Sequence, residues 1–555
     1  MARTLICAAV IGGLAALCMP AGAQGTGAPL PHRWFYCSGY RQSRQDVDRI
    51  KSLIRTAADH GLNGVVLDYL GLDSITRWGE EEFALFQEVA DVCRQEGIEL
   101  IPTGFSVGYG GGALWHDRNF AAALPVTIRL EARGSGAIPV PGPDLMVNGD
   151  LEQHEGDRFT GFDFHDQPGE ISFAEAAVAA SGTTSIRFEN LTANEHGHGR
   201  IMQRVAVAPG RCYRFSFRIR TEDLEPVSGV QALVLAGERT LASTQPGLQP
   251  TQDWTDVTLE FITVEETEVR VYAGIWGGRS GRFWIDDMQV RQYGTLADIV
   301  RREGTPLGLR SLDRDTAFVE GRDFEPVENR PDLEALALTP GTSVREGERL
   351  ELDCYKTPFI GHGWGRQISL CMSNPALYDY WESQARRLHE VLPYKRFLLS
   401  MDEIRNGGGC LLCKQRGMTM AEILGDCFTR QRAIFKAIDP DIEVLTWSDM
   451  LDPNHNAHDD YYHVVGDFTG SWRYVPKDLV IMCWWKERKA ESLAFFSAQG
   501  FRTMGACYYD ADDLSSSREW LDLLTATPGA QGIMYTSWER KYDLLAAYGD
   551  MVSGR

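Results

Sequence analysis

The sequence predicts an α/β protein, a (β/α)8 TIM barrel with an inserted antiparallel β-sandwich of the jelly-roll type. Eight short apolar, β-branched or aromatic runs occur along the chain, most of them separated by helical patterns, and eight parallel strands close such a barrel. A block between the third and fourth runs lacks the helical period and consists of short alternating runs. With 555 residues, 43% of them hydrophobic, the chain is long enough to bury both cores.

The barrel elements are expected in a simple order. The predicted strands are 33–39, 64–70, 98–105, 396–405, 443–450, 479–485, 502–510 and 532–539. Apolar residues at helical spacing predict helices over 46–60, 80–96 and 374–391, and Gly61 is a good stop for the first helix.

The inserted block is recognised by its change of pattern. Runs such as 212–221 and 253–264 alternate in polarity and are separated by Gly, Pro and Asp. The flanks 137–143 and 294–308 are rich in Gly and Pro, which marks them as connections. The predicted organisation is a signal peptide at 1–23, barrel strands 1 to 3 in 24–143, the sandwich in 144–293, and barrel strands 4 to 8 in 294–555.

The amino-terminal residues predict export. Arg3 precedes the apolar run 5–19, and Ala21-Gly22-Ala23 offers the small residues that signal peptidase cleaves after. We therefore expect a secreted or periplasmic protein without a membrane segment after signal removal. The formal charge of -22 argues against nucleic acid as a partner, because that binding needs a basic surface.

Two groups of metal-ligand residue types occur in loops. Cys410 and Cys413 form the one close cysteine pair in the sequence, and a four-cysteine zinc site would need a second pair. A local disulfide or two loop thiols is therefore preferred to a metal. The histidine-rich stretch 454–460, with His463 beyond it, lacks a helical HExxH frame, so we predict no metal there either.

Five predicted strand ends are rich in carboxylates and aromatic residues. In such barrels the carboxyl ends of the strands line the active site. Carboxylates supply acid, base or nucleophile roles, and Trp faces stack on sugar rings. The five ends read Ser400-Met401-Asp402-Glu403-Ile404-Arg405, Thr446-Trp447-Ser448-Asp449, Cys483-Trp484-Trp485-Lys486, Tyr508-Tyr509-Asp510 and Thr536-Ser537-Trp538-Glu539. Together they predict a site that acts on a glycan or glycoside.

The adjacent acids Asp402 and Glu403 are the sharpest of these signals. Neighbouring residues of an ideal strand point to opposite faces, so both can approach one substrate only where the strand ends and the chain turns. The preceding run 397–399 is typical of a buried strand, which places the pair at such an end.

The strand ends resemble glycoside hydrolase family 20, the β-N-acetylhexosaminidases, in their order along the barrel. The stretch 33–44 resembles the family's first strand and its arginine, Arg41 or Arg44 here. Asp402-Glu403 resembles the catalytic pair, and Trp447-Ser448-Asp449-Met450 resembles the Trp-Asp-Asp strand. Trp484 or Trp485, then Tyr508-Tyr509-Asp510, then Trp538-Glu539 resemble the later motifs. Ser400-Met401 departs from the two glycines usual in the family, and the α/β domain that usually precedes the barrel is missing.

This resemblance implies a retaining, exo-acting mechanism without a catalytic cofactor. Glu403 would be the acid and base, and Asp402 would orient the substrate's 2-acetamido group, whose carbonyl oxygen is the nucleophile. One of Tyr508 and Tyr509 would bind the acetamido oxygen, and alternation allows only one of them to point inward. The predicted substrate-binding residues are Arg41, Trp447, Asp449, Trp484, Trp485, Tyr508, Tyr509, Asp510, Trp538 and Glu539.

The insert resembles carbohydrate-binding modules of families 4 and 9. The resemblance is carried by 147–152, by Pro209-Gly210-Arg211 and the strand after it, by Asp253-Trp254, and by Phe283-Trp284-Ile285-Asp286-Asp287. It implies a jelly-roll, often with a structural calcium, and leaves open whether the module binds sugar or acts as a spacer.

Two other functions stay open at this stage. The barrel could be a retaining glycosidase with a protein nucleophile, Asp510 or Glu539, and Glu403 as acid and base. It could also be a catalytically silent sugar-binding protein, since the two family glycines are absent.

Overall fold

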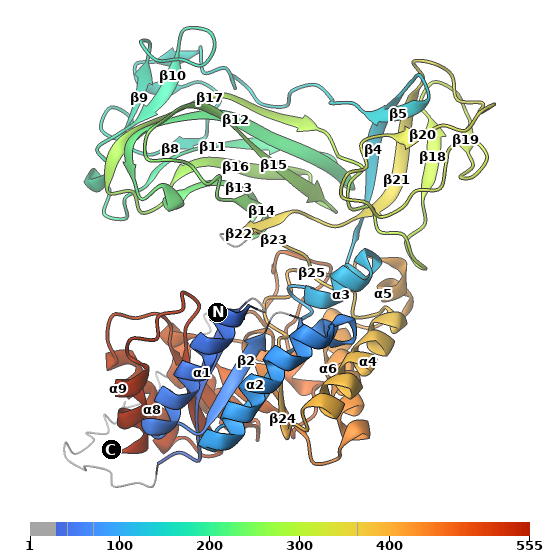
Figure 1. Cartoon of the computed structure of the whole chain (residues 1–555). Helices are drawn as coiled ribbons and strands as arrows, with labels where there is room; N and C mark the ends of the chain where they lie inside the picture. The colour runs from blue at the N-terminus through green and yellow to red at the C-terminus, as the bar shows by residue number, and fades with distance from the viewer. Residues whose placement is uncertain (1–28, 41–42, 70, 363–364) are drawn as a thin grey trace, which may run out of the picture.

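The computed structural model describes residues 29–40, 43–69, 71–362 and 365–555. Eight parallel strands form a closed barrel in the order β1-β2-β3-β24-β26-β28-β29-β30 (Figure 1). They are β1 (His32–Tyr40), β2 (Gly64–Tyr69), β3 (Glu99–Gly104), β24 (Arg396–Leu399), β26 (Glu443–Trp447), β28 (Val480–Cys483), β29 (Arg502–Tyr508) and β30 (Ala530–Thr536). Each lies within or overlaps one of the eight predicted runs, so the predicted barrel is confirmed.

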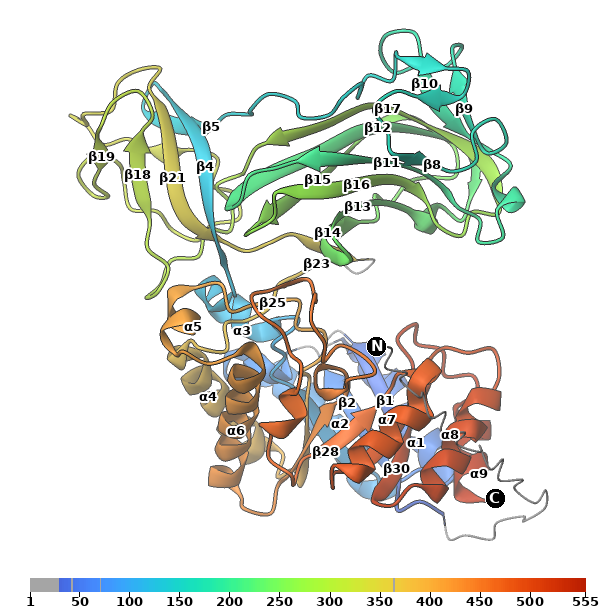
Figure 2. The ribbon, with the colours of Figure 1, turned by 180° about the vertical axis from the view of Figure 1, so that it is seen from behind.

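Helices cover the outside of the barrel (Figure 2). They are α1 (Arg44–Asp59), α2 (Glu80–Glu96), α4 (Pro375–Val391), α6 (Met420–Ile438), α7 (Lys489–Ala498), α8 (Ser515–Ala526) and α9 (Leu545–Ser553), with the short α3 (Gly111–His116) and α5 (Leu411–Gln415). Local signals set their starts. The Asn374 side chain accepts from the Ala376 N–H, and Thr419 with Glu422 forms a capping box. None of the helices in the described part of the chain is long and apolar enough to cross a membrane.

The barrel has two apolar layers. Inward-facing residues such as Val66, Leu398 and Met504 fill its interior and are almost fully buried. A larger cluster, which includes Phe86 and Trp381, lies between the strands and the surrounding helices. The parallel strands are therefore buried on both faces, which is why they read as continuous apolar runs in the sequence.

The chain between β3 and β24 forms the β-rich part. One sheet has the order β14-β13-β16-β11-β8, and the other has the order β19-β18-β21-β4-β12-β17-β10-β9, with β15 on β12 and with β5 and β20 beside β4. The longer strands are β4 (Leu124–Arg133), β11 (Gly199–Ala206), β12 (Arg211–Glu225), β13 (Val230–Ala236), β14 (Arg239–Thr244), β15 (Gln252–Thr263), β16 (Glu268–Ile275), β17 (Ser280–Gln292) and β21 (Arg349–Lys356). The shorter ones are β5 (Gly136–Pro139), β6 (His154–Glu155), β7 (Arg158–Phe159), β8 (Phe164–His165), β9 (Ser172–Glu175), β10 (Ser185–Phe188), β18 (Gly308–Ser311), β19 (Ala317–Phe318), β20 (Leu336–Ala337), β22 (Ile360–His362) and β23 (Gly365–Gln367), and β25 (Asn406–Gly407) and β27 (His463–Val464) pair after β24 and β26.

The β-rich part extends beyond the predicted boundaries 144 and 293. Strand β4, assigned to the barrel by the range 24–143, pairs along its length with β21, which the range 294–555 had also assigned to the barrel. These two strands share an apolar cluster of their own, separate from the one between the sandwich sheets. The burial of β4 alternates strictly along its ten residues, as expected for a strand with one buried face.

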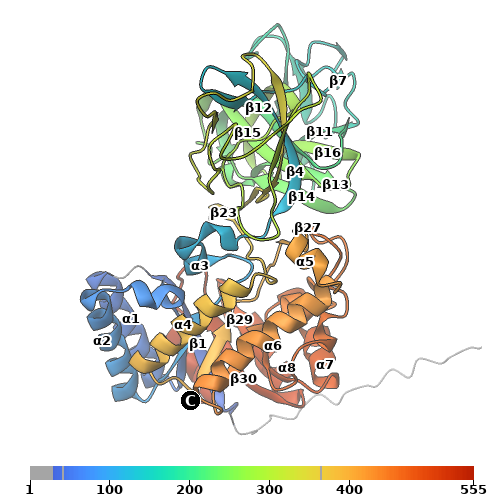
Figure 3. The ribbon, with the colours of Figure 1, turned by 90° about the vertical axis from the view of Figure 1, so that its right-hand side faces the viewer.

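The β-rich part sits over the carboxyl ends of the barrel strands. The chain leaves β3 through α3, and β4 then rises away from the barrel (Figures 1 and 3). The Ser243 hydroxyl beside β22 donates to the Gly361 carbonyl at 3.0 Å. A ring nitrogen of buried His463 hydrogen-bonds the Leu241 carbonyl, which joins a barrel loop to β14.

Candidate active site

Asp402 and Glu403 lie just beyond the carboxyl end of β24. Glu403 has a φ of 48°, in the left-handed region, so the backbone turns at the second acid and the strand alternation no longer holds there. The Glu403 N–H donates to Asp449 Oδ2 at 2.8 Å, which fixes this turn against the end of β26. Such a strained backbone at a polar strand end is typical of functional sites.

Gly108, in the loop after β3, packs directly on this backbone. A Cβ at this position would meet the carbonyl oxygen of Asp402, with the Glu403 carbonyl oxygen at 2.9 Å and its carbon at 3.1 Å. Only a glycine allows the loop to approach so closely.

Asp449 is fully buried, and half-buried Asp402 lies near enough to feel its charge. Asp449 accepts hydrogen bonds from the Asn456 side chain at 2.9 Å and the Trp484 indole N–H at 3.4 Å, and burial raises its pKa to about 7. Burial, and then the negative charges of Asp449 and Glu403, hold the pKa of Asp402 well above its usual range. In the described structure Asp402 Oδ1 is buried without a hydrogen-bond partner, so this oxygen is available to a ligand.

Both carboxylate oxygens of Glu403 are held by side chains that the sequence did not predict. Arg405 Nη2 lies 2.9 Å from Oε1, and the Tyr109 hydroxyl donates to Oε2. Gln367 donates to the Glu403 carbonyl at 2.7 Å and accepts from Arg405 at 2.5 Å. These contacts fix Glu403 from the loop after β3, from β23 and from its own loop.

Four of the predicted aromatic residues come together at the carboxyl ends of the barrel strands. Trp447 is buried at the top of the barrel interior, 6.2 Å between ring centroids from Trp538. Tyr509 stacks on Trp484 at 5.9 Å with an interplanar angle of 11°, and lies 6.4 Å from Trp538. Trp538 keeps 36% of its surface exposed, so an apolar face is available to a ligand.

The structure separates the two tyrosines, with only one of them in the site. Residues 508, 509 and 510 all have positive φ, so the chain reverses its sides at the end of β29. Tyr508 stacks on Tyr535 at 4.0 Å in the outer core. Tyr509 faces the site, where burial and the charges of Asp402, Asp449 and Glu403 raise its pKa well above the usual range.

Several predicted residues have other surroundings. Asp510 accepts from the Ser537 hydroxyl at 2.5 Å and the Trp538 N–H at 2.9 Å, so it anchors the loop after β30. Glu539 is exposed and pairs with Lys541 at 2.8 Å. These two contacts make Asp510 a support for Trp538 and place Glu539 at the rim.

The remaining predicted residues do not join the cluster. Trp485 packs on His455, 3.8 Å between ring centroids. Arg41 lies outside the described residues. Its alternative, Arg44, begins α1 and pairs with Glu88 on the exposed surface at 2.7 Å, which does not suit it for holding a sugar hydroxyl.

Tyr36 and Asp68 belong to the site but were missed. The Tyr36 hydroxyl donates to Asp68 Oδ2 at 3.2 Å, and burial raises the pKa of Asp68 to about 6. Tyr36 also lies 5.1 Å between ring centroids from Trp538. A carboxylate directly after the apolar run 65–67 is the same signal that identified Asp402, so Asp68 could have been found.

The two groups of loop residues considered for metal binding differ in their surroundings. His455 sits between Trp484 and Trp485, where burial lowers its pKa to about 3. Cys410 and Cys413 are free thiols with their sulfurs 3.6 Å apart. Across the described residues, the carboxylates of the sandwich do not gather into a group of three around one point. The calcium implied for this module therefore stays a prediction.

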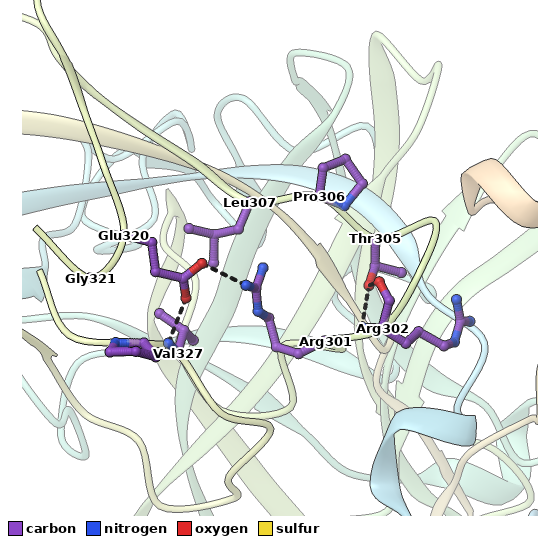
Figure 4. A pocket seen from close by; sticks show the side chains of 9 residues that line it. Arg301, Arg302, Thr305, Pro306, Leu307, Glu320, Gly321 and Val327 are labelled. Atoms are coloured by element: carbon purple, nitrogen blue, oxygen red, sulfur yellow. Dashed lines mark hydrogen bonds and ion pairs between the residues drawn. The ribbon is translucent and has the colours of Figure 1, made fainter.

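A cavity of about 600 Å³ lies in the β-rich part (Figure 4). It is lined by Arg301, Arg302, Thr305, Pro306, Leu307, Glu320, Gly321, Pro326 and Val327. Arg301 pairs with Glu320 at 2.7 Å, and the Val327 N–H donates to the other carboxylate oxygen (Figure 4). Glu320, the one acidic residue that lines this cavity, therefore already has partners for both carboxylate oxygens, whereas Asp402 at the barrel has an oxygen without one.

No family model matches the chain, and no curated protein matches its sequence. Among solved structures, a rhamnosidase from Novosphingobium sp. PP1Y is similar over 94% of this chain and 58% of that one, at 11% identity and a TM-score of 0.34. A β-N-acetylhexosaminidase is similar over 34% and 44%, at 14% identity and 0.26. TmCBM61, solved with β-1,4-galactotriose, is similar over 27% and 99%, at 16% identity and 0.21. The assignment of a function therefore rests on the residues of the site.

Proposed function

We propose that this protein is an exo-acting glycoside hydrolase that cleaves β-N-acetylhexosaminides with retention of configuration. The proposal is carried by one observation: two consecutive carboxylates, Asp402 and Glu403, stand at a turn at the carboxyl end of a barrel strand, near the aromatic cluster of Trp447, Tyr509 and Trp538. Carboxylates near aromatic rings suit a pyranose ring. The resemblance of the strand ends to family 20 supplies the acetamido specificity.

The two acids would have different catalytic roles. Glu403 would donate a proton to the glycosidic oxygen and then take one from water, because general acid and base roles are exchanged in the two halves of a retaining reaction. Arg405 and Tyr109 fix its two oxygens for that purpose. The substrate's own acetamido oxygen would attack the anomeric carbon.

Asp402 would orient the acetamido group. Its buried Oδ1 lacks a partner and can accept the acetamido N–H, and an ionised Asp402 would stabilise the positive charge that develops on the ring formed by the attack. Tyr509 would donate to the acetamido oxygen from the other side. Binding of the N–H donor favours the ionised form of Asp402, which burial disfavours in the free site.

The reading with a protein nucleophile fits the geometry less well. Asp510 spends its oxygens on Ser537 and the Trp538 backbone, and Glu539 is exposed beside Lys541. A nucleophile must be free to attack, so neither group is poised for this role. Export through residues 1–23 is part of the proposal and rests on the sequence. Whether the sandwich binds sugar or acts as a spacer stays open.

The test is a Glu403→Gln variant assayed on nitrophenyl glycosides with and without the 2-acetamido group. We expect a loss of about 10²–10⁴-fold in kcat on the acetamido substrates, the usual contribution of a general acid and base. Glu390→Gln is the matched control, because the Glu390 side chain is exposed on the outer face of α4 and pairs only with Arg387 among the contacts described.

Three outcomes would contradict the proposal. Full activity of Glu403→Gln would remove Glu403 from the chemistry. Equal turnover of sugars lacking the acetamido group, with trapping by a 2-fluoro glycoside, would favour a protein nucleophile. Binding of glycosides without turnover by the wild-type protein would make it a sugar-binding protein.

A further inference from the structure

Three cysteine sulfurs meet in the loop region beside the active site. Cys371 Sγ lies 3.6 Å from Cys410 Sγ and 3.8 Å from Cys413 Sγ, and the last two are 3.6 Å apart. All three side chains are buried, with 5% or less of their surface exposed. Of the His, Cys, Asp and Glu residues that the structure describes, these three form the one group arranged to hold a metal ion.

The spacing matches a metal site and not a disulfide. Four thiolates about 2.3 Å from a tetrahedral zinc ion lie about 3.8 Å from one another, so three sulfurs at these distances form one face of such a tetrahedron. A disulfide would need two sulfurs about 2.05 Å apart. We propose that Cys371, Cys410 and Cys413 bind one thiophilic divalent cation, with zinc as the ion to test.

The three ligands are preorganised by backbone contacts. The Cys371 N–H donates to the Phe120 carbonyl at 2.8 Å, and the Leu411 N–H, next to Cys410, donates to Gly304 at 3.0 Å. The sulfurs are therefore brought together by the chain leaving the barrel, the chain returning to it, and the loop after Glu403. This explains why the sequence, in which Cys371 stands far from the pair, did not indicate the group.

A positive charge lies near the sulfurs. Arg302 acts electrostatically on both Cys371 and Cys410 and favours their thiolate forms, which are the forms that bind metal. Metal binding would release the thiol protons.

The role that follows is structural. Two of the three cysteines stand a few residues after side chains of the active site. Gln367 precedes Cys371, and Arg405 precedes Cys410. Gln367 and Arg405 bond each other and Glu403. A bound ion would tie both segments together behind Glu403. The Ser373 hydroxyl, beside Cys413, or a water molecule would complete the coordination.

The experiment measures metal content and thiol state of the full-length protein. We expect about one zinc per chain by mass spectrometry of the elements, and loss of it in Cys410→Ser and Cys371→Ser. Cys93→Ser, which removes a buried thiol of α2, is the matched control and should keep the metal. Cobalt substitution should give thiolate charge-transfer absorption in the wild type.

The wild-type measurements decide the proposal even where a variant fails to fold. A protein that contains no metal and takes up none from added zinc would overturn it. So would an intact mass two hydrogens low because of a disulfide within the trio, or a Cys410→Ser variant that keeps its zinc. None of these readouts uses glycosidase activity, so they are independent of the proposed function.

Discussion

Replacing Gly108 by Ala tests whether the position of the acid pair governs activity. The new Cβ would sit 2.9 Å from the Glu403 carbonyl oxygen and closer still to that of Asp402. Carbon and oxygen atoms need about 3.5 Å, and the Asp402 carbonyl oxygen would be much nearer than that, so one backbone has to move by at least about 1 Å. Both neighbours are backbone atoms at a turn with positive φ, and neither can rotate away as a side chain would.

The magnitude follows from that displacement. A misplacement of about 1 Å at reacting groups costs about 10²-fold in rate, which corresponds to about 2.7 kcal/mol in the barrier. Overpacking also costs about 1–3 kcal/mol of folding free energy, so Tm should fall by a few degrees. We expect this loss of about 10²-fold in kcat on a nitrophenyl N-acetylhexosaminide. Circular dichroism at the assay temperature should show that the variant is folded.

Gly308→Ala is the control for this substitution. A Cβ at Gly308 meets nothing within 4 Å in the described structure, so its activity and Tm should match the wild type. Wild-type kcat in Gly108→Ala would refute the reasoning, because it would show that the backbone of Asp402 and Glu403 can shift without harm.

Two further predictions concern charge. Asp449→Asn keeps an oxygen that can accept from the Glu403 N–H but removes a charge that, after burial, helps to raise the pKa of Asp402. Because the mechanism needs ionised Asp402, the acid limb of the kcat/KM profile should move to lower pH. An acid limb at the wild-type pH would contradict this. Arg396→Met removes three hydrogen bonds to carboxylates at the amino ends of the barrel strands and should cost about 1–3 kcal/mol, whereas Arg386→Met on an exposed helix pair should cost under about 0.5 kcal/mol. Burial alone would raise the pKa of Glu443, but its arginine partners outweigh burial and lower the pKa. The stability that this ion pair adds is therefore fully present above the unfolded pKa of about 4.3 and is lost as the pH falls through the folded pKa. An equal fall in Tm for Arg396→Met and Arg386→Met in thermal unfolding would contradict this prediction.

The barrel could be predicted because its signals are local. Each strand is a short apolar run buried on both faces, and each predicted helix carries its own spacing and caps. The prediction 80–96 matches α2 residue for residue. The boundaries of the insert failed for the opposite reason. Strand β4 is stabilised by pairing with β21, which lies far along the chain. No local pattern in the sequence indicates which distant strand will pair with it.

The site residues also divide into those that local sequence signals identify and those that depend on tertiary contacts. Asp402, Asp449 and Trp447 stand at the ends of recognisable strands, so their convergence follows from the barrel itself. Arg405 and Tyr109 stand in irregular loops, where tertiary contacts and not periodicity decide the direction of a side chain. The choice between Tyr508 and Tyr509 depended on positive φ at the strand end, and aromatic residues give no sequence sign of that conformation.

The insertion contributes to the surroundings of the acid pair. Tyr109 lies on the segment by which the chain leaves β3 toward the β-rich part, and Gln367 is the last residue of β23, on the segment that returns. Both contact Glu403, one at its side chain and one at its backbone. A barrel with a short connection after β3 would keep the strand-borne carboxylates but lose these two contacts. The Glu403 side chain would then be held by Arg405 alone, and Arg405 would lack Gln367 to orient it. The inserted part therefore helps to position the acid that the mechanism needs, whether or not its sandwich also binds sugar.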